Sequence, residues 1–198
     1  MHLLLKREQK SLFLKSVYEL SFISFMKRGT LKDSLNFGAR TCVNRMTKLQ
    51  SIKLDLPELE NLIVWAHIDD RNIASVIVTE KDYPESAAKI VLKKLVKEFH
   101  AQYPKFDEDE VSTDQNLSLP KFDEFIQKYQ NPEEADKLLK VEKDLSEINT
   151  IMNKTMKDML ERGENLDDLV KQSEDISFLA KQFHEKSRKA NTKCCSIY

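Results

Sequence analysis

Residues 131–190 read NPEEADKLLKVEKDLSEINTIMNKTMKDMLERGENLDDLVKQSEDISFLAKQFHEKSRKA. Steps of alternately three and four residues, taken in both directions from Arg162, give sixteen positions that would lie along one side of a helix. We call these positions the seam. Twelve of these are apolar, against seven of the other 37 residues between 138 and 190. Besides Arg162, the seam comprises Leu138, Val141, Leu145, Ile148, Met152, Thr155, Met159, Leu166, Leu169, Ser173, Ile176, Ala180, Phe183, Ser187 and Ala190. This period of about 3.5 residues predicts a coiled-coil helix, since ordinary surface helices rarely run so long.

The start of this helix is marked by Asn131, Pro132 and Glu134. Asn131 can cap the first turn, Pro132 suits the first helical position, and Glu134 follows the cap by three residues as in a capping box. No further proline occurs before Ala190, and Gly163 is the only glycine in the segment.

Arg162 lies at the middle of the seam, with seven seam positions before it and eight after it. A guanidinium group cannot be deprotonated, so an apolar layer would leave its charge without partners. One interpretation is a polar layer that fixes register and partner choice. The alternative is that Arg162 lies at the edge of the apolar seam, where its aliphatic part covers apolar surface and its guanidinium group reaches solvent.

The first hundred residues contain patterns typical of strands alternating with patterns typical of helices. Ser11–Leu20 predicts a strand, and an apolar stripe over Leu31–Met46 predicts a helix. Leu62–Ile68 and Ile73–Thr79, separated by Asp-Asp-Arg-Asn, predict a hairpin, and Pro84 opens a helix that runs through Tyr103. We therefore predict an α+β domain with an antiparallel sheet flanked by helices. A polar loop over residues 105–116 and a short helix over Leu119–Tyr129 should follow.

Composition argues against an enzyme. The 32 basic and 33 acidic residues nearly cancel, so the net charge of −1 gives no sign of a nucleic-acid partner. Three glycines are too few, at these spacings, for a P-loop or a dinucleotide fingerprint. His67 and His100 have no partner at metal-ligand spacing, so neither a metal site nor a small-molecule substrate is predicted. Cys42 falls on the apolar stripe of its helix and is predicted to be a core residue.

The segment ERGENLDDLV, Glu161–Val170, resembles the centre of R-SNARE motifs. The chain as a whole is similar to the YKT-type synaptobrevin homologues, in which an N-terminal longin domain precedes an R-SNARE motif and a CC-x-x-x ending. VIVTEKDYP, Val76–Pro84, resembles the strand-to-helix turn of their longin domain. The resemblance implies that Arg162 meets three glutamines from Q-SNARE helices in a four-helix bundle that draws two membranes together.

The last residues, Cys194-Cys195-Ser196-Ile197-Tyr198, have the C-a-a-X form that predicts prenylation of Cys195. Cys194 is a candidate acylation site, and the basic residues from Lys186 to Lys193 favour anionic lipid. Tyr198 differs from the final methionine usual in this family. The alternative is that neither Cys194 nor Cys195 is modified. Covalent lipid is the only cofactor-like group that the sequence predicts.

Phe37 points away from the apolar stripe of its predicted helix, on an otherwise polar face. Such an aromatic side chain suggests a contact site. In the resembled family this helix helps to line a groove that receives the SNARE segment. We therefore predict an autoinhibitory contact between Phe37 and the seven apolar residues outside the seam: Leu139, Ile151, Met156, Leu160, Val170, Phe178 and Leu179.

These observations divide the chain into four parts: a longin domain (1–104), a linker with a short helix (105–130), an R-SNARE coiled-coil motif (131–191) and a lipidated tail (192–198). The predicted function is vesicle docking and fusion in ER, Golgi and endosomal transport. The alternative is a prenylated coiled-coil adaptor or tether without fusion activity. With no signal peptide and no long apolar run, the chain is expected in the cytosol and, through its tail, on the cytosolic face of those membranes.

Overall fold

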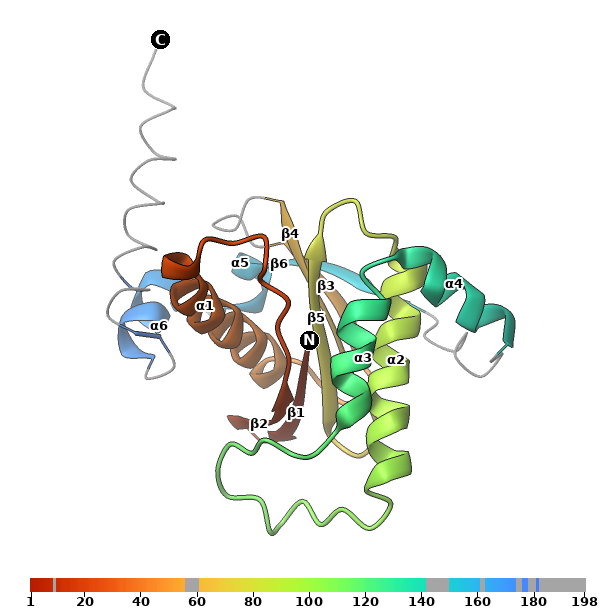
Figure 1. The fold of residues 1–198 in the computed structure, drawn as a ribbon. Coiled ribbons are helices and arrows are strands. Elements are labelled where there is room, and N and C mark those ends of the chain that lie inside the picture. Colours follow the sequence, from red (N-terminus) through yellow and green to blue (C-terminus); the bar gives the residue numbers. More distant parts are fainter. Residues whose placement is uncertain are drawn as a thin grey trace.

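The computed structural model describes residues 1–8, 10–55, 61–141, 150–160, 163–173, 176–177 and 181. Figure 1 shows the arrangement of its helices and strands. In chain order they are β1 His2–Arg7, β2 Lys10–Ser16, α1 Phe25–Asn44, β3 Ser51–Asp55, β4 Leu62–Ile68, β5 Ile73–Glu80, α2 Glu85–Gln102, α3 Pro120–Lys128, α4 Pro132–Val141, β6 Met152–Thr155, α5 Met156–Met159 and α6 Leu166–Gln172.

Within the described residues the strands form one sheet in the order β2-β1-β5-β4-β3-β6. The first five strands pair antiparallel, as predicted, and the β4–β5 hairpin has the predicted position. β6 joins β3 in parallel, with Ile52 opposite Met152 and Asp55 opposite Thr155. The sheet is therefore mixed, because a strand from the heptad segment (residues 131–191) satisfies an edge that β3 would otherwise expose.

The sheet separates two apolar cores, with α1 on one face and α2 and α3 on the other (Figure 1). Successive side chains of a strand point to opposite faces. Leu3 and Leu5 accordingly lie in the core under α2, whereas Leu4 lies in the core under α1. Cys42 is fully buried in the second core, which confirms its predicted place.

The N-terminal domain (residues 1–104) differs from prediction at four places. The strand β1 was not predicted, and it lies inside the sheet between β2 and β5. β2 ends at Ser16 rather than Leu20, and α1 begins at Phe25 rather than Leu31. The early helix start escaped prediction because Phe25 and Met26 are exposed and do not extend the apolar stripe. β3 was not predicted, since the five residues SIKLD give too short a pattern.

The acidic loop after α2 is held against the sheet rather than free in solvent. The backbone N–H groups of Gln115 and Leu117 donate to the carbonyl oxygens of Phe13 and Leu14, at 2.7 and 2.9 Å. Asp114 accepts a hydrogen bond from the Phe13 N–H and forms an ion pair with Arg40. The loop thus covers the open edge of β2, where unpaired backbone groups would invite pairing with another chain.

The heptad segment is not one continuous helix in this structure. It begins with α4 at the predicted proline, and the Asn131 side chain accepts a hydrogen bond from the Glu133 N–H. It then contributes β6, α5 and α6. The long helix predicted over residues 131–191 belongs to the coiled coil and is not formed in the isolated chain, because a coiled-coil seam needs partner helices to cover it. Without partner helices, Ile151 and Met159 are buried against the N-terminal domain, and Val170 and Ile176 are buried in a cluster with Phe37.

Candidate interaction site

Several contacts attach the described parts of the heptad segment to the N-terminal domain, and Ala135 of α4 is already buried in the core under α2. We call this arrangement the closed form. Two further contacts are the pairing of β6 with β3 and the side chain of Ile151, which is buried in the same core. Three more, described below, lie on the α1 side of the sheet.

Met159 is buried in the core between α1 and the sheet, with 8% of its surface exposed. Ala39 and Cys42 of α1 and Ile52 of β3 belong to the same cluster. Met159 is a seam position, so its side chain would occupy the centre of a coiled coil if the segment were helical. The closed form and a bundle therefore compete for the same apolar surface.

The ion pair between Arg45 and Glu164 lies close to this contact. Arg45 caps the C-terminal end of α1, and its guanidinium lies 2.8 Å from a carboxylate oxygen of Glu164. The two side chains are 18% and 31% exposed, so solvent screens the pair in part. Glu164 follows Arg162 by two residues in the sequence, so the described residues just after the middle of the predicted seam begin beside the end of α1.

Phe37 joins a small apolar cluster with Leu166, Val170 and Ile176. Val170 and Ile176 are buried, and Phe37 is half-buried. Val170 lies outside the seam, as expected for the partner of Phe37, but Leu166 and Ile176 are seam positions. The prediction is wrong for Ile151, which is buried in the core under α2 instead, because it lies beside β6 on the other side of the sheet from Phe37.

Local capping stabilises the broken path of the segment. Thr155 caps α5: its hydroxyl accepts from the Asp158 N–H, and Asp158 accepts from the Thr155 N–H at 2.8 Å. The Thr155 N–H and the Thr155 hydroxyl both donate to the Asp158 carboxylate, which lowers the pKa of Asp158. Asn165 caps α6 through the Asp168 N–H. Gly163 adopts a φ of 93°, a conformation that glycine reaches without strain.

The caps at Thr155 and Asn165 were missed in the sequence, although both carry a recognisable signal. Thr155 and Asn165 each precede an aspartate by three residues, the spacing of a helix start. A continuous helix would leave no free backbone N–H for either cap to bind. The same sixty residues therefore carry signals for two structures, one long helix and several short elements.

Several predicted site residues lie outside the described part of the chain: Arg162, Cys194, Cys195, Leu145, Ile148, Ala180, Phe183, Ser187 and Ala190. The backbone of Leu138 and Val141 is described within α4, but their side chains are not. Among the remaining seam positions, Met152 and Thr155 are exposed, and Leu169 and Ser173 are half-buried. The roles of all these residues stay predictions.

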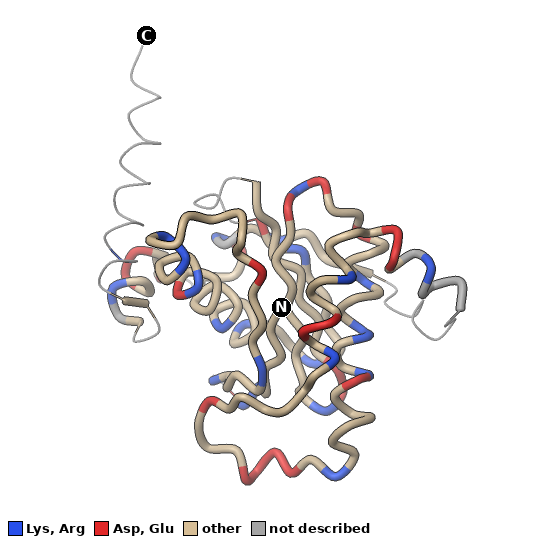
Figure 2. The backbone as a smooth tube through the Cα atoms, in the orientation of Figure 1, with Lys and Arg blue, Asp and Glu red and all other residues tan. Residues whose placement is uncertain are grey.

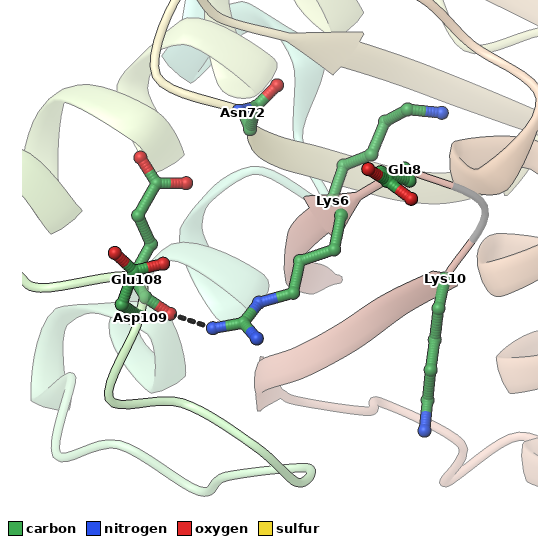
Figure 3. Close-up of a pocket in the computed structure, with 7 residues that line it drawn as sticks. Lys6, Glu8, Lys10, Asn72, Glu108 and Asp109 are labelled. Atoms are coloured by element: carbon green, nitrogen blue, oxygen red, sulfur yellow. Dashed lines mark hydrogen bonds between the residues drawn. The ribbon is translucent and has the colours of Figure 1, made fainter.

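A surface pocket lies between the β1–β2 turn and the loop after α2 (Figure 3). It is lined by Lys6, Arg7, Glu8, Lys10, Asn72, Glu108 and Asp109. Its charges are of both signs, and Arg7 donates to the backbone carbonyl of Glu108. The Lys6 ammonium donates to the carbonyls of Val43 and Asn44 at the end of α1, at 3.1 and 2.7 Å. These cations have structural partners, so the pocket does not present a catalytic arrangement.

The described part of the chain also gives little support for a metal site, a membrane-spanning helix or a reactive side chain. It contains no group of three or more potential metal-ligating side chains, and none of its helices has the length and apolar character needed to cross a bilayer. Burial raises the pKa of the Cys42 thiol to about 12, so this cysteine is no nucleophile at neutral pH. His67 and His100 bond to Ser51 and Asp69, consistent with structural roles.

Comparison with known proteins assigns both halves of the chain. The Longin family model, described as a regulated-SNARE-like domain, matches residues 20–126, and the Synaptobrevin model matches residues 137–196. The synaptobrevin homologue YKT6 of Saccharomyces cerevisiae is 33% identical over 190 residues, 96% of this chain and 93% of the relative. The putative synaptobrevin homologue YKT6 of Dictyostelium discoideum is 32% identical over 186 residues, 94% and 91% of the two chains.

The order of these matches agrees with the structure. The longin match covers α1, the hairpin and the helices that sandwich the sheet, and the synaptobrevin match covers the segment that folds back onto them. Members of this family are SNARE proteins and not enzymes, and SNARE proteins interact with other SNAREs. The chain belongs to the YKT6-type synaptobrevin homologues, the longin-domain R-SNAREs of vesicle trafficking.

Proposed function

We propose that the protein is a lipid-anchored R-SNARE that exchanges its closed form for a parallel four-helix bundle with three Q-SNARE helices. The observation that carries this proposal is the location of Met159, Leu166 and Ile176. These three seam residues pack against the N-terminal domain in the closed form. They would form apolar layers in the bundle, so a chain cannot occupy both states at once.

The exchange provides a way to hold a fusion protein inactive until partners arrive. Each buried large apolar side chain contributes about 1.5–3 kcal/mol, so the few side chains of the closed form give it limited stability. A bundle would bury up to sixteen layers along the whole segment. Three Q-SNARE helices would therefore displace the N-terminal domain, whereas a single weak partner would not.

The membrane attachment proposed here is covalent. Prenylation of Cys195 and acylation of Cys194 would hold the C-terminal end of the bundle on one membrane, while the Q-SNAREs hold the other. Formation of the bundle would then pull the two membranes together. The expected locations are the cytosol and the cytosolic faces of Golgi, ER-derived vesicle and endosomal membranes.

Replacing Arg162 by leucine tests the bundle. The wild-type chain mixed with three Q-type helices should give a complex with one copy of each, read by native mass spectrometry. Arg162→Leu should leave the N-terminal domain folded but lower the fraction in this complex by about tenfold, since three glutamines would lose their charged partner.

Arg162→Lys is the matched control, because it keeps the charge while losing the planar fork, and it should retain part of the assembly. Equal assembly by Arg162→Leu and the wild-type chain would refute the central-layer role. A homodimer of the chain alone would instead indicate the adaptor function.

A further inference from the structure

The start of α1 exposes a group of large apolar side chains. Phe22, Phe25 and Met26 are 71%, 84% and 89% exposed, within a stretch of five residues. Single exposed apolar residues are common, but a contiguous group on a folded domain marks an interaction surface. We call residues 22–27 together with Lys32 the α1 tip.

The loop that carries Phe22 is fixed in place. The Arg28 guanidinium donates to the carbonyl oxygens of Ile23 at 2.8 Å and Ser21 at 3.1 Å. A Glu19 carboxylate oxygen accepts from the Ser21 N–H at 2.9 Å, and its other oxygen accepts from Gln127. The apolar side chains are therefore displayed by an ordered turn, which lowers the entropy lost when they are buried by a partner.

Cationic side chains accompany the apolar ones. Lys27 and Lys32 are exposed on α1, and Figure 2 shows several basic segments along this helix. The first turn of α1 has no acidic residue, although acidic side chains there would favour the helix dipole. Glu19 and Asp33 are the nearest acidic residues in the sequence, and Glu19 is occupied by the hydrogen bonds just described. The residue choice at this end of α1 thus serves contact rather than helix stability.

Aromatic and apolar side chains flanked by lysines fit the interface of a bilayer with anionic headgroups. Aromatic rings favour the headgroup level, and basic residues are attracted to the negative surface of the cytosolic leaflet. A protein partner would instead offer a shaped groove and acidic side chains. The tip lies at a loop and the first turn of a helix, and its three large apolar side chains are more than two-thirds exposed, which suits insertion into a soft interface.

We propose that the α1 tip docks the N-terminal domain onto anionic membrane surfaces, with Phe25 and Met26 entering the boundary between headgroups and acyl chains. This contact uses no lipid on the protein and none of the seam residues. The proposal therefore goes beyond the SNARE function. An experiment can refute membrane docking by the α1 tip without refuting the four-helix bundle, and the reverse is also true. Its consequence is a second attachment point on the longin domain itself.

A fluorescent probe at the tip tests the proposal directly. The full chain carrying Cys194→Ser and Cys195→Ser has no lipid, and its only tryptophan, Trp65, is 1% exposed in the core. Phe25→Trp in this background should shift its emission to the blue on vesicles of phosphatidylcholine and phosphatidylserine, and brominated acyl chains should quench it.

Leu49→Trp is the matched control. Leu49 is also 71% exposed, but it lies beyond the other end of α1, a helix of twenty residues and about 30 Å. A tryptophan there should keep the emission of a water-exposed ring. The comparison separates insertion at the tip from binding by the basic tail, which would move neither probe.

Partition to the same vesicles, measured by sedimentation, gives the second readout. Phe25→Ser and Met26→Ser should each weaken binding by about tenfold, the effect of one large apolar side chain. Lys27→Glu with Lys32→Glu should weaken binding to anionic but not to neutral vesicles. The proposal is overturned if Phe25→Trp emission stays unchanged on saturating vesicles, or if the serine variants bind as well as the parent chain.

Discussion

Replacing Phe37 by glutamate is expected to open the closed form while the longin domain stays folded. Phe37 belongs to a small cluster with Leu166, Val170 and Ile176 that is separate from both main cores. The substitution removes a large apolar side chain and places a carboxylate against buried Val170, at a cost of about 1.4 kcal/mol or more. The ratio of closed to open chains should therefore fall by about tenfold or more.

Hydrogen exchange followed by mass spectrometry measures this effect. The amides of β6 and α6 should exchange faster in Phe37→Glu, whereas those of β4 and β5 should keep wild-type rates. Phe25→Glu is the matched control, since Phe25 lies on the same helix but is 84% exposed and outside the cluster. Equal rates in the wild type and Phe37→Glu would mean that Phe37 does not hold the closed form.

Charge reversal at the Arg45–Glu164 pair gives an independent check on the same opening. Arg45→Glu would place two carboxylates where an ion pair of 2.8 Å now stands. Because the pair is partly exposed, we expect a smaller effect than for Phe37→Glu, about 1 kcal/mol or less. Adding Glu164→Arg should restore slow exchange. Continued fast exchange in the double variant would assign the effect of Arg45→Glu to helix α1 rather than to the pair.

Replacing Cys195 by serine is expected to move the protein from membranes to the soluble fraction of cells. Each buried CH₂ of a lipid contributes about 0.8 kcal/mol, but one chain gives only reversible binding, so a stable anchor needs two signals. In the proposed order prenylation comes first, since it would bring Cys194 to the membrane where acylation could follow. Cys195→Ser should therefore remove both lipids, whereas Cys194→Ser should leave the prenyl group and a protein that cycles on and off membranes.

Fractionation and mass spectrometry of the C-terminal peptide check this order. The two adjacent cysteines act as each other's control, because both substitutions change one thiol to a hydroxyl. Firm attachment of Cys195→Ser would show that the tail is not the anchor. Lipid on Cys194 in that variant would reverse the proposed order.

The sequence predicted those elements whose pattern is complete within a single segment. The helical pattern that Pro84 opens predicted α2, and the two β-branched runs around Asp69 predicted the hairpin, since each pattern depends on the burial of its own residues. β3 was not predicted, because it has no such pattern of its own. Its five residues become a strand because β4 pairs with one side and β6 with the other, neither of which its own sequence specifies.

The heptad segment shows a different limit. Its period indicates burial among partner helices, whereas in the isolated chain three of the described seam residues, Met159, Leu166 and Ile176, contact the longin domain instead. Met152 is a seam residue in one state and a strand residue in the other, and Thr155 changes from a layer to a helix cap. Phe37 was found from sequence because an aromatic side chain broke a polar face. Arg45 was missed because its partner Glu164 lies 119 positions away.

The distance between Lys53 and Asn153 is the most direct measure of the exchange between the two states. These residues lie opposite each other on β3 and β6, where neighbouring strands are about 5 Å apart. Spin labels at both positions, in a chain with Cys194 and Cys195 replaced by serine, should report a short distance in the free chain. Addition of three Q-type SNARE helices should replace it by a long, broad distribution. A short distance that persists in the four-helix complex, or a long one in the free chain, would contradict the exchange of the closed form for the bundle.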